Sequence, residues 1–294
     1  MNKLIKAKRS SDNYVHLLVR GAGNLGKIEL AEEFFLMLQE VGDKCLPTRI
    51  GESEPVKIKY SMENAKNLWV ASEKDSRWGG GILFKGPSGL FGMVDWNNVD
   101  NSNNTSLQIS LKAILANKGI NKLVMFAKKL FIWSNGYYGH AYHGSKPIFS
   151  SGLGCRTCLP GISWLNLFGK PYVKMFGANV IESTPCYVEE FADNSYMLLT
   201  SEEPSRVTPE LLEKHELVKN HLGKEAFDRK DPPSQDVYTM EDIKAGRHLV
   251  STEGYRSPDL SEYLKDTIER KNEELFAVAN DDGTLTTFKV EHKE

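Results

Sequence analysis

Two groups of residues have the types and spacing that could carry chemistry. The first is the loop Gly21-Ala22-Gly23-Asn24-Leu25-Gly26, which matches the pattern G-x-G-x-x-G. Between a strand and a helix, such a loop can hold a dinucleotide pyrophosphate on its backbone N–H groups. The chain that follows offers no second parallel strand ending in an acidic residue for the ribose. The loop is therefore predicted to be a flexible glycine turn, with a nucleotide- or NAD-binding enzyme as the alternative.

The second group consists of His140 and His143, followed by Cys155 and Cys158. Imidazoles and thiolates suit tetrahedral Zn²⁺. However, both histidines fall in a predicted strand, where residues three apart point to opposite faces. The cysteine pair also lacks the βαβ context of a thioredoxin-type redox site. We therefore expect the chain to fold without metal or cofactor, and zinc binding by these four residues remains the alternative.

The sequence does not single out catalytic residues. It has no serine on a sharp strand-to-helix turn, no papain-type cysteine setting and no metalloprotease helix, and no spacing marks a pair of carboxylates for acid/base work. We predict a protein that is not an enzyme.

Acidic residues are concentrated at the C-terminal end. Residues 231–294 contain fifteen Asp and Glu against eight Lys and Arg, a net charge of −7, which leaves +5 for residues 1–230. The total of −2 argues against direct nucleic-acid binding. A helix is predicted from 257 to about 274, and spacings of three and four place five carboxylates on one face of it: Asp259, Glu262, Asp266, Glu269 and Glu273. This row is either a solvated face or a docking surface for a basic partner.

Hydrophobic patterning predicts an α+β fold, with antiparallel meanders packed against amphipathic helices. The predicted strands are 14–20, 80–85, 90–96, 106–112, 137–143, 187–191 and 196–200. The predicted helices are 28–41, 62–70, 120–133 and 208–222. This order also allows two similar halves, each with a helix and a meander.

The segment 161–176 is rich in aromatic residues and is predicted to form two short helical pieces. Trp164, Phe168, Tyr172 and Phe176 recur every four residues, which predicts a helical stripe. Such a stripe is typical of a core, and a surface anchor for a partner protein is the alternative.

The run Asp231-Pro232-Pro233-Ser234 predicts a boundary between two parts. Residues 1–230 would form an α+β domain, and 231–294 an acidic C-terminal extension with one long helix and two short strands around residues 281–283. No apolar stretch approaches the roughly 18 residues of a membrane span, and the N-terminus has no export signal. We therefore expect a cytoplasmic protein without membrane contacts.

One phrase resembles a known family, and it reads LPGISWLNLFGKPYVKMFG at residues 159–177. It is similar to a signature of bacterial immunity proteins of polymorphic-toxin and type VI secretion systems, such as the immunity protein 52 family or a related type VI immunity family. The predicted hairpin around 187–200 and the Thr-Pro-Glu helix at 208–222 match the same pattern, and the resemblance spans about residues 14–230. It implies a non-enzymatic cytoplasmic inhibitor that binds a cognate toxin or effector domain, frequently a nuclease. It further implies that the phrase builds the core, with recognition left to surface residues.

Overall fold

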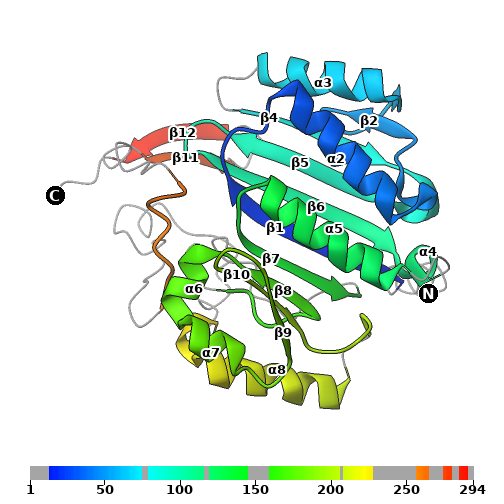
Figure 1. The fold of residues 1–294 in the computed structure, drawn as a ribbon. Coiled ribbons are helices and arrows are strands. Elements are labelled where there is room, and N and C mark those ends of the chain that lie inside the picture. Colours follow the sequence, from blue (N-terminus) through cyan, green and yellow to red (C-terminus); the bar gives the residue numbers. More distant parts are fainter. Residues whose placement is uncertain are drawn as a thin grey trace, which may run out of the picture.

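The computed structural model describes residues 13–74, 79–115, 119–144, 159–205, 208–227 and 256–264, and the backbone of 274–279 and 285–290. Its main feature is a 10-stranded antiparallel sheet with the order β3-β2-β4-β5-β6-β1-β7-β8-β10-β9 (Figure 1). The strands are β1 Tyr14–Ala22, β2 Arg49–Gly51, β3 Ile58–Lys59, β4 Gly79–Lys85, β5 Phe91–Asn97, β6 Ser102–Ser110, β7 Gly136–His143, β8 Leu165–Phe168, β9 Tyr187–Ala192 and β10 Ser195–Leu199. The predicted α+β class is therefore confirmed.

Three helices cover one face of this sheet: α2 Ile28–Val41, α3 Met62–Lys74 and α5 Ile120–Trp133. They bury every second residue of the central strand β1, namely Val15, Leu17 and Val19. Figure 1 shows α2 and α5 side by side on this face, and Lys129 of α5 forms an ion pair with Glu40 of α2. The short helix α4, Leu111–Leu115, follows β6.

The helices of the second half lie on the opposite face. They are α6 Lys170–Phe176, α7 Ala178–Glu182 and α8 Pro209–Leu222, and they enclose a second core with β7, β8 and β10. Successive side chains of a strand point to opposite faces of the sheet. In β8, Leu167 therefore packs in the first core and its neighbour Phe168 in the second. Strands β8 and β10 are thus mostly buried on both faces, whereas the edge strand β9 is partly exposed.

The helix predictions for 28–41 and 120–133 are confirmed at both ends. The prediction of helical pieces throughout 161–176 is wrong for residues 165–168, which form strand β8. A strand fits this stretch because nearly every residue is apolar, which is typical of a strand buried on both faces. The four aromatic residues are buried as a core interpretation requires, but they do not form one helical stripe, since Trp164 lies in the first core and the other three in the second.

The helix predicted to begin at 257 is wrong for residues 257–264, where the chain has no regular structure before a single turn at 261–263. The Asp259 carboxylate accepts a hydrogen bond from the Ser261 backbone N–H at 3.0 Å, and this local bond competes with helix formation. Residues 265–273 lie outside the described residues. The two short strands predicted beyond them are confirmed as β11 Glu274–Ala279 and β12 Leu285–Val290, which pair antiparallel.

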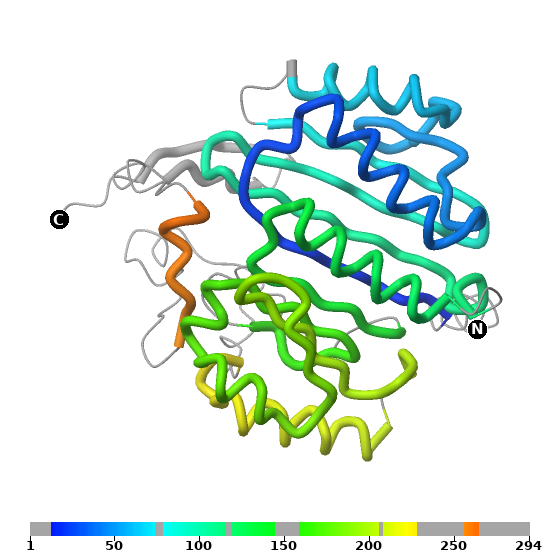
Figure 2. The backbone as a smooth tube through the Cα atoms, in the orientation of Figure 1, coloured from blue at the N-terminus to red at the C-terminus, as the bar shows by residue number. Residues whose placement is uncertain are grey.

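Residues 256–264 pack against the α+β domain, and in Figure 2 this segment lies beside α6. Leu264 is buried in the second core, and the Asn101 side chain donates to the Tyr263 carbonyl at 2.9 Å. Arg256 donates a hydrogen bond to the Met175 carbonyl of α6 and forms an ion pair with Glu225 at 3.7 Å.

The boundary predicted at 231–234 lies outside the described residues and stays a prediction. Among the described helices, none has the length and apolar character to span a membrane.

Candidate functional site

The glycine loop after β1 is filled by the protein's own side chains. The Glu73 carboxylate lies where a Cβ on Gly26 would stand, and the Asn24 amide donates to this carboxylate and to Asn98. Strand β1 is antiparallel to both neighbours, whereas a dinucleotide fold needs parallel strands. A carboxylate at the loop repels a phosphate, so the geometry favours the predicted turn over the nucleotide-binding alternative.

Two of the three glycines in the Gly21–Gly26 sequence, Gly21 and Gly23, give a matched pair of stability variants. Gly23 has φ +106° with open space around it, so Gly23→Ala should cost about 1 kcal/mol through backbone strain alone. A Cβ on Gly21 would collide with the Ser134 carbonyl, so Gly21→Ala should cost more, roughly 1–3 kcal/mol from overpacking. Urea unfolding of both variants measures the difference, and equal costs would contradict this description of the loop.

His140 and His143 both lie on β7, as predicted. His140 is buried, with Nδ1 at 3.3 Å from the Tyr138 hydroxyl and 3.4 Å from that of Ser163. Cys155 and Cys158 lie outside the described residues, so the zinc alternative stays untested. Within the described ranges, His, Cys, Asp and Glu side chains do not gather in groups of three that could hold a metal ion.

A polar row crosses the sheet on the face opposite α2 and α3. Register places Asp95 beside Asn104, and Asn104 beside Arg20. Burial raises the pKa of Asp95, while the hydrogen bond from Asn104 and the Arg20 charge act in the other direction. Burial, and then the same Arg20 charge, lower the pKa of His140 to about 3. Burial, aided by the Arg20 charge, therefore keeps His140 neutral and makes the sheet sensitive to acid.

The acidic residues proposed for partner binding are only partly within the described chain. Asp259 and Glu262 are exposed on the turn after Arg256, so they do not begin a helical row. Asp266, Glu269 and Glu273 lie outside the described residues, and their role stays a prediction.

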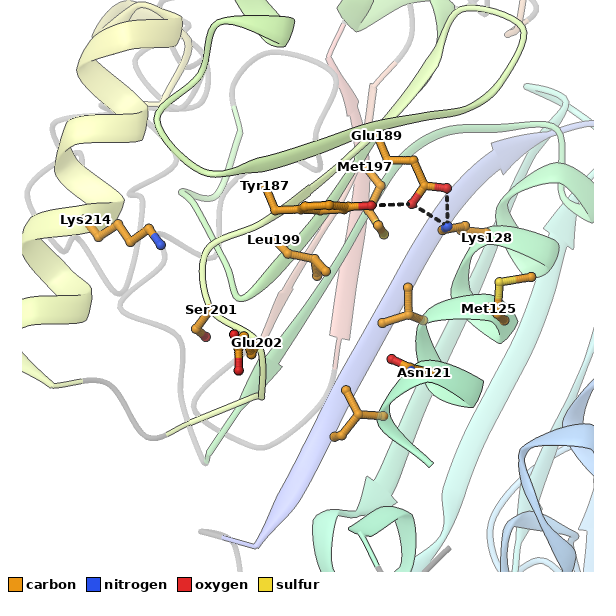
Figure 3. A pocket seen from close by; sticks show the side chains of 12 residues that line it. Asn121, Met125, Lys128, Tyr187, Glu189, Met197, Leu199, Ser201, Glu202 and Lys214 are labelled. Carbon is orange, nitrogen blue, oxygen red and sulfur yellow. Dashed lines mark hydrogen bonds and ion pairs between the residues drawn. The ribbon is translucent and has the colours of Figure 1, made fainter. Parts of the chain in front are cut away.

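A groove that the sequence did not reveal lies between α5 and the β9–β10 hairpin (Figure 3). Its volume is about 650 Å³. The floor is apolar and comes from both elements: Ile120, Val124 and Met125 of α5, with Met197 and Leu199 of β10. Met125 is 50% exposed and Tyr187, on the opposite wall, is 57% exposed. Large apolar side chains that converge on a concave surface are typical of binding sites.

One ion pair ties the two walls of this groove together. Lys128 of α5 contacts both carboxylate oxygens of Glu189 on β9, at 2.6 and 2.7 Å. The Tyr187 hydroxyl donates to the same carboxylate at 3.4 Å, as Figure 3 shows. These bonds fix the groove's shape. Further polar groups line it: Asn121 on α5, Ser201 and Glu202 after β10, and Lys214, which reaches toward the groove from α8.

Sequence reasoning missed the groove because its walls come from segments about 60 residues or more apart. A weak signal was present, since Lys128 and Lys129 interrupt the most apolar stretch of the chain. In the folded chain, Lys128 forms the ion pair with Glu189 that links α5 to β9. The groove has an apolar floor, walls held together by the Lys128–Glu189 ion pair, and exposed side chains at its edges. It therefore suits binding.

Comparisons with known proteins do not identify a family. No family model matches the chain, and no curated protein matches it. Among solved structures, it is similar to a Pseudomonas aeruginosa T6SS protein, PA0821, with a TM-score of 0.49 and 10% identity over 71% of this chain and 73% of that one. It is also similar to the duplicated taurocyamine kinase of Schistosoma mansoni, with a TM-score of 0.21 and 9% identity over 74% of this chain and 33% of that one. Neither likeness carries a functional argument.

Proposed function

We propose that this protein is a non-enzymatic immunity protein that binds and neutralises a cognate bacterial toxin in the cytoplasm. The observation that carries the proposal is the groove between α5 and the β9–β10 hairpin. It leaves a half-exposed Met125 and Tyr187 around an apolar floor, beside two otherwise well-packed cores. Apolar and aromatic side chains of this kind are the usual anchors of protein interfaces.

The resemblance of residues 159–177 to immunity proteins supports the same proposal from a different part of the chain. The aromatic residues of that phrase are buried and stabilise the fold, so they cannot contact a partner. The groove supplies an exposed surface for that contact. A toxin that acts on nucleic acid is one candidate partner, because the predicted acidic extension would attract its basic surface.

The test is a protection assay with the protein encoded beside this gene as the candidate toxin. Expression of that protein in a bacterial host should stop growth, and co-expression of this chain should restore it. The double variant Met125→Asp and Tyr187→Ala should bind the toxin about 100-fold more weakly and lose protection, because both changes remove apolar contact area from the groove.

Leu36→Asp is the matched control. Leu36 lies on α2 and is 48% exposed, so the change also puts a charge on an exposed apolar helix position, but outside the groove. It should protect like the wild type, and circular dichroism should show that all variants are folded. A neighbouring toxin that this chain neither binds nor neutralises would contradict the proposal.

A further inference from the structure

We propose that residues 256–264 form a latch, which opens as a unit while the rest of the α+β domain stays folded. When it is closed, the latch joins α6 to the turn between β5 and β6. The glycine loop after β1 supports that turn, so this loop is part of the seat of the latch. The latch thus controls whether one side of the second core is covered.

The first end of the latch is fixed by Arg256. Its side chain donates to the Met175 carbonyl and lies over the Phe176 ring, with the guanidinium carbon 6.0 Å from the ring centroid. Its backbone N–H donates to the Glu225 carbonyl at 3.3 Å. The ion pair of Arg256 with the Glu225 carboxylate joins side chains that are 42% and 48% exposed, so it adds little to the stability of the closed latch.

The second end of the latch is held by Tyr263 and Leu264. Leu264 is buried in the second core, and the Tyr263 ring meets the Tyr137 ring edge-on, with 6.3 Å between their centroids. The N–H groups of Tyr263 and Leu264 both donate to the Leu260 carbonyl at 2.9 Å, which closes a single turn. One isolated turn is not stable in water, so these two amides are protected from exchange only while the latch is docked.

The glycine loop reaches the latch through Asn101. The Asn101 side chain donates to the Tyr263 carbonyl at 2.9 Å, and the Asn101 carbonyl accepts from the Gly23 N–H at 2.7 Å. The Gly23 carbonyl in turn accepts from the Asn103 side chain at 3.1 Å. Asn101 has φ +60° and Gly23 has φ +106°, conformations that favour asparagine and glycine. The loop therefore positions the side chain that holds the latch.

The latch can open without breaking the sheet or a helix. Within the described residues, a single backbone–backbone hydrogen bond, from Arg256 to Glu225, joins residues 256–264 to the rest of the chain. Segments held by few bonds and a small apolar contact open locally, at a lower free energy than the strands of a core. Opening withdraws Leu264 from the second core and the Tyr263 ring from Tyr137.

Native-state hydrogen exchange of the full chain, followed by NMR, tests the latch. The amides of Tyr263 and Leu264 should have protection factors about 100-fold lower than the amides of the central strand β1. Their exchange should also depend little on low concentrations of urea, because opening exposes little surface. Equal protection and equal urea dependence for the latch and β1 would overturn the proposal, since the segment would then unfold only with the whole domain.

Asn101→Gly is the sharpest variant, because glycine keeps the positive φ and removes the side chain that bonds Tyr263. It should speed exchange at the latch about fivefold, as expected for the loss of one hydrogen bond, and leave β1 unchanged. Asn194→Gly is the matched control, since Asn194 has φ +51° in the turn between β9 and β10, outside the latch. Equal acceleration by both variants would overturn the role of Asn101.

Two further variants test the apolar anchor and the seat. Leu264→Ala should speed exchange at the Tyr263 amide about 30-fold, because it removes the side chain that docks in the second core. Gly23→Ala should speed it about threefold, because a closed latch holds the loop in the strained conformation and an open latch lets the loop relax. A latch that is unchanged in Gly23→Ala would overturn the part of the proposal that concerns the glycine loop.

Discussion

Lowering the pH from 7 to 4 is expected to cost the fold about 3 kcal/mol through His140 alone. His140 is buried at the centre of the sheet, where loss of hydration and then the Arg20 charge lower its pKa to about 3. In the unfolded chain the imidazole titrates at its ordinary value near 6.5. Stability is therefore fully present above pH 6.5 and falls as the pH drops toward 3, because only the unfolded state takes up the proton. The measurement is the free energy of unfolding in urea at several pH values.

The variant His140→Gln isolates this contribution, because glutamine fills similar space and does not titrate. Its stability should depend less steeply on pH than that of the wild type, by about 1.4 kcal/mol per pH unit between 6.5 and 4. His215 acts in the same direction, since burial lowers its pKa to about 4, and His215→Gln provides a second comparison. Parallel pH profiles for wild type and His140→Gln would show that His140 is hydrated or compensated in the folded state.

Helices α2, α5 and α8 could be predicted closely because their ends are encoded locally. Helix α2 ends where Gly42 adopts φ +148°, a conformation that favours glycine, and α8 begins where the Thr208 hydroxyl accepts a bond from the Leu211 N–H. Both signals lie within a few residues of the element they terminate. The hairpin around Asn194, which has a positive φ, was predictable for the same reason.

The errors have the opposite cause, because they depend on packing that the local sequence does not contain. Strand β8 was predicted as helix, since aromatic residues four apart suit a helical stripe as well as a strand with two buried faces. The segment from Ser257 was predicted as helix from its charge spacing, but Leu264 is instead placed by the second core and Arg256 by α6. The groove is the extreme case, because it exists only once α5 and the β9–β10 hairpin have packed on one sheet.

The segment that carries the resemblance to immunity proteins is expected to act through stability. Phe168 is fully buried, with its ring centroid 6.2, 5.8 and 5.4 Å from those of Tyr138, Tyr172 and Phe176. Phe168→Ala would leave a cavity among these rings and should lower the free energy of unfolding by about 3–5 kcal/mol.

Lys174→Ala is the control in the same segment. Lys174 is exposed on α6, so this change should alter the free energy of unfolding by no more than about 0.5 kcal/mol. Urea unfolding gives both values, and the growth-protection assay should then be run at low temperature, where Phe168→Ala is still folded. Protection should persist there, because the ring is enclosed by the second core and cannot reach a partner. A Phe168→Ala protein that is as stable as the wild type but fails to protect would instead place the partner contact in residues 159–177.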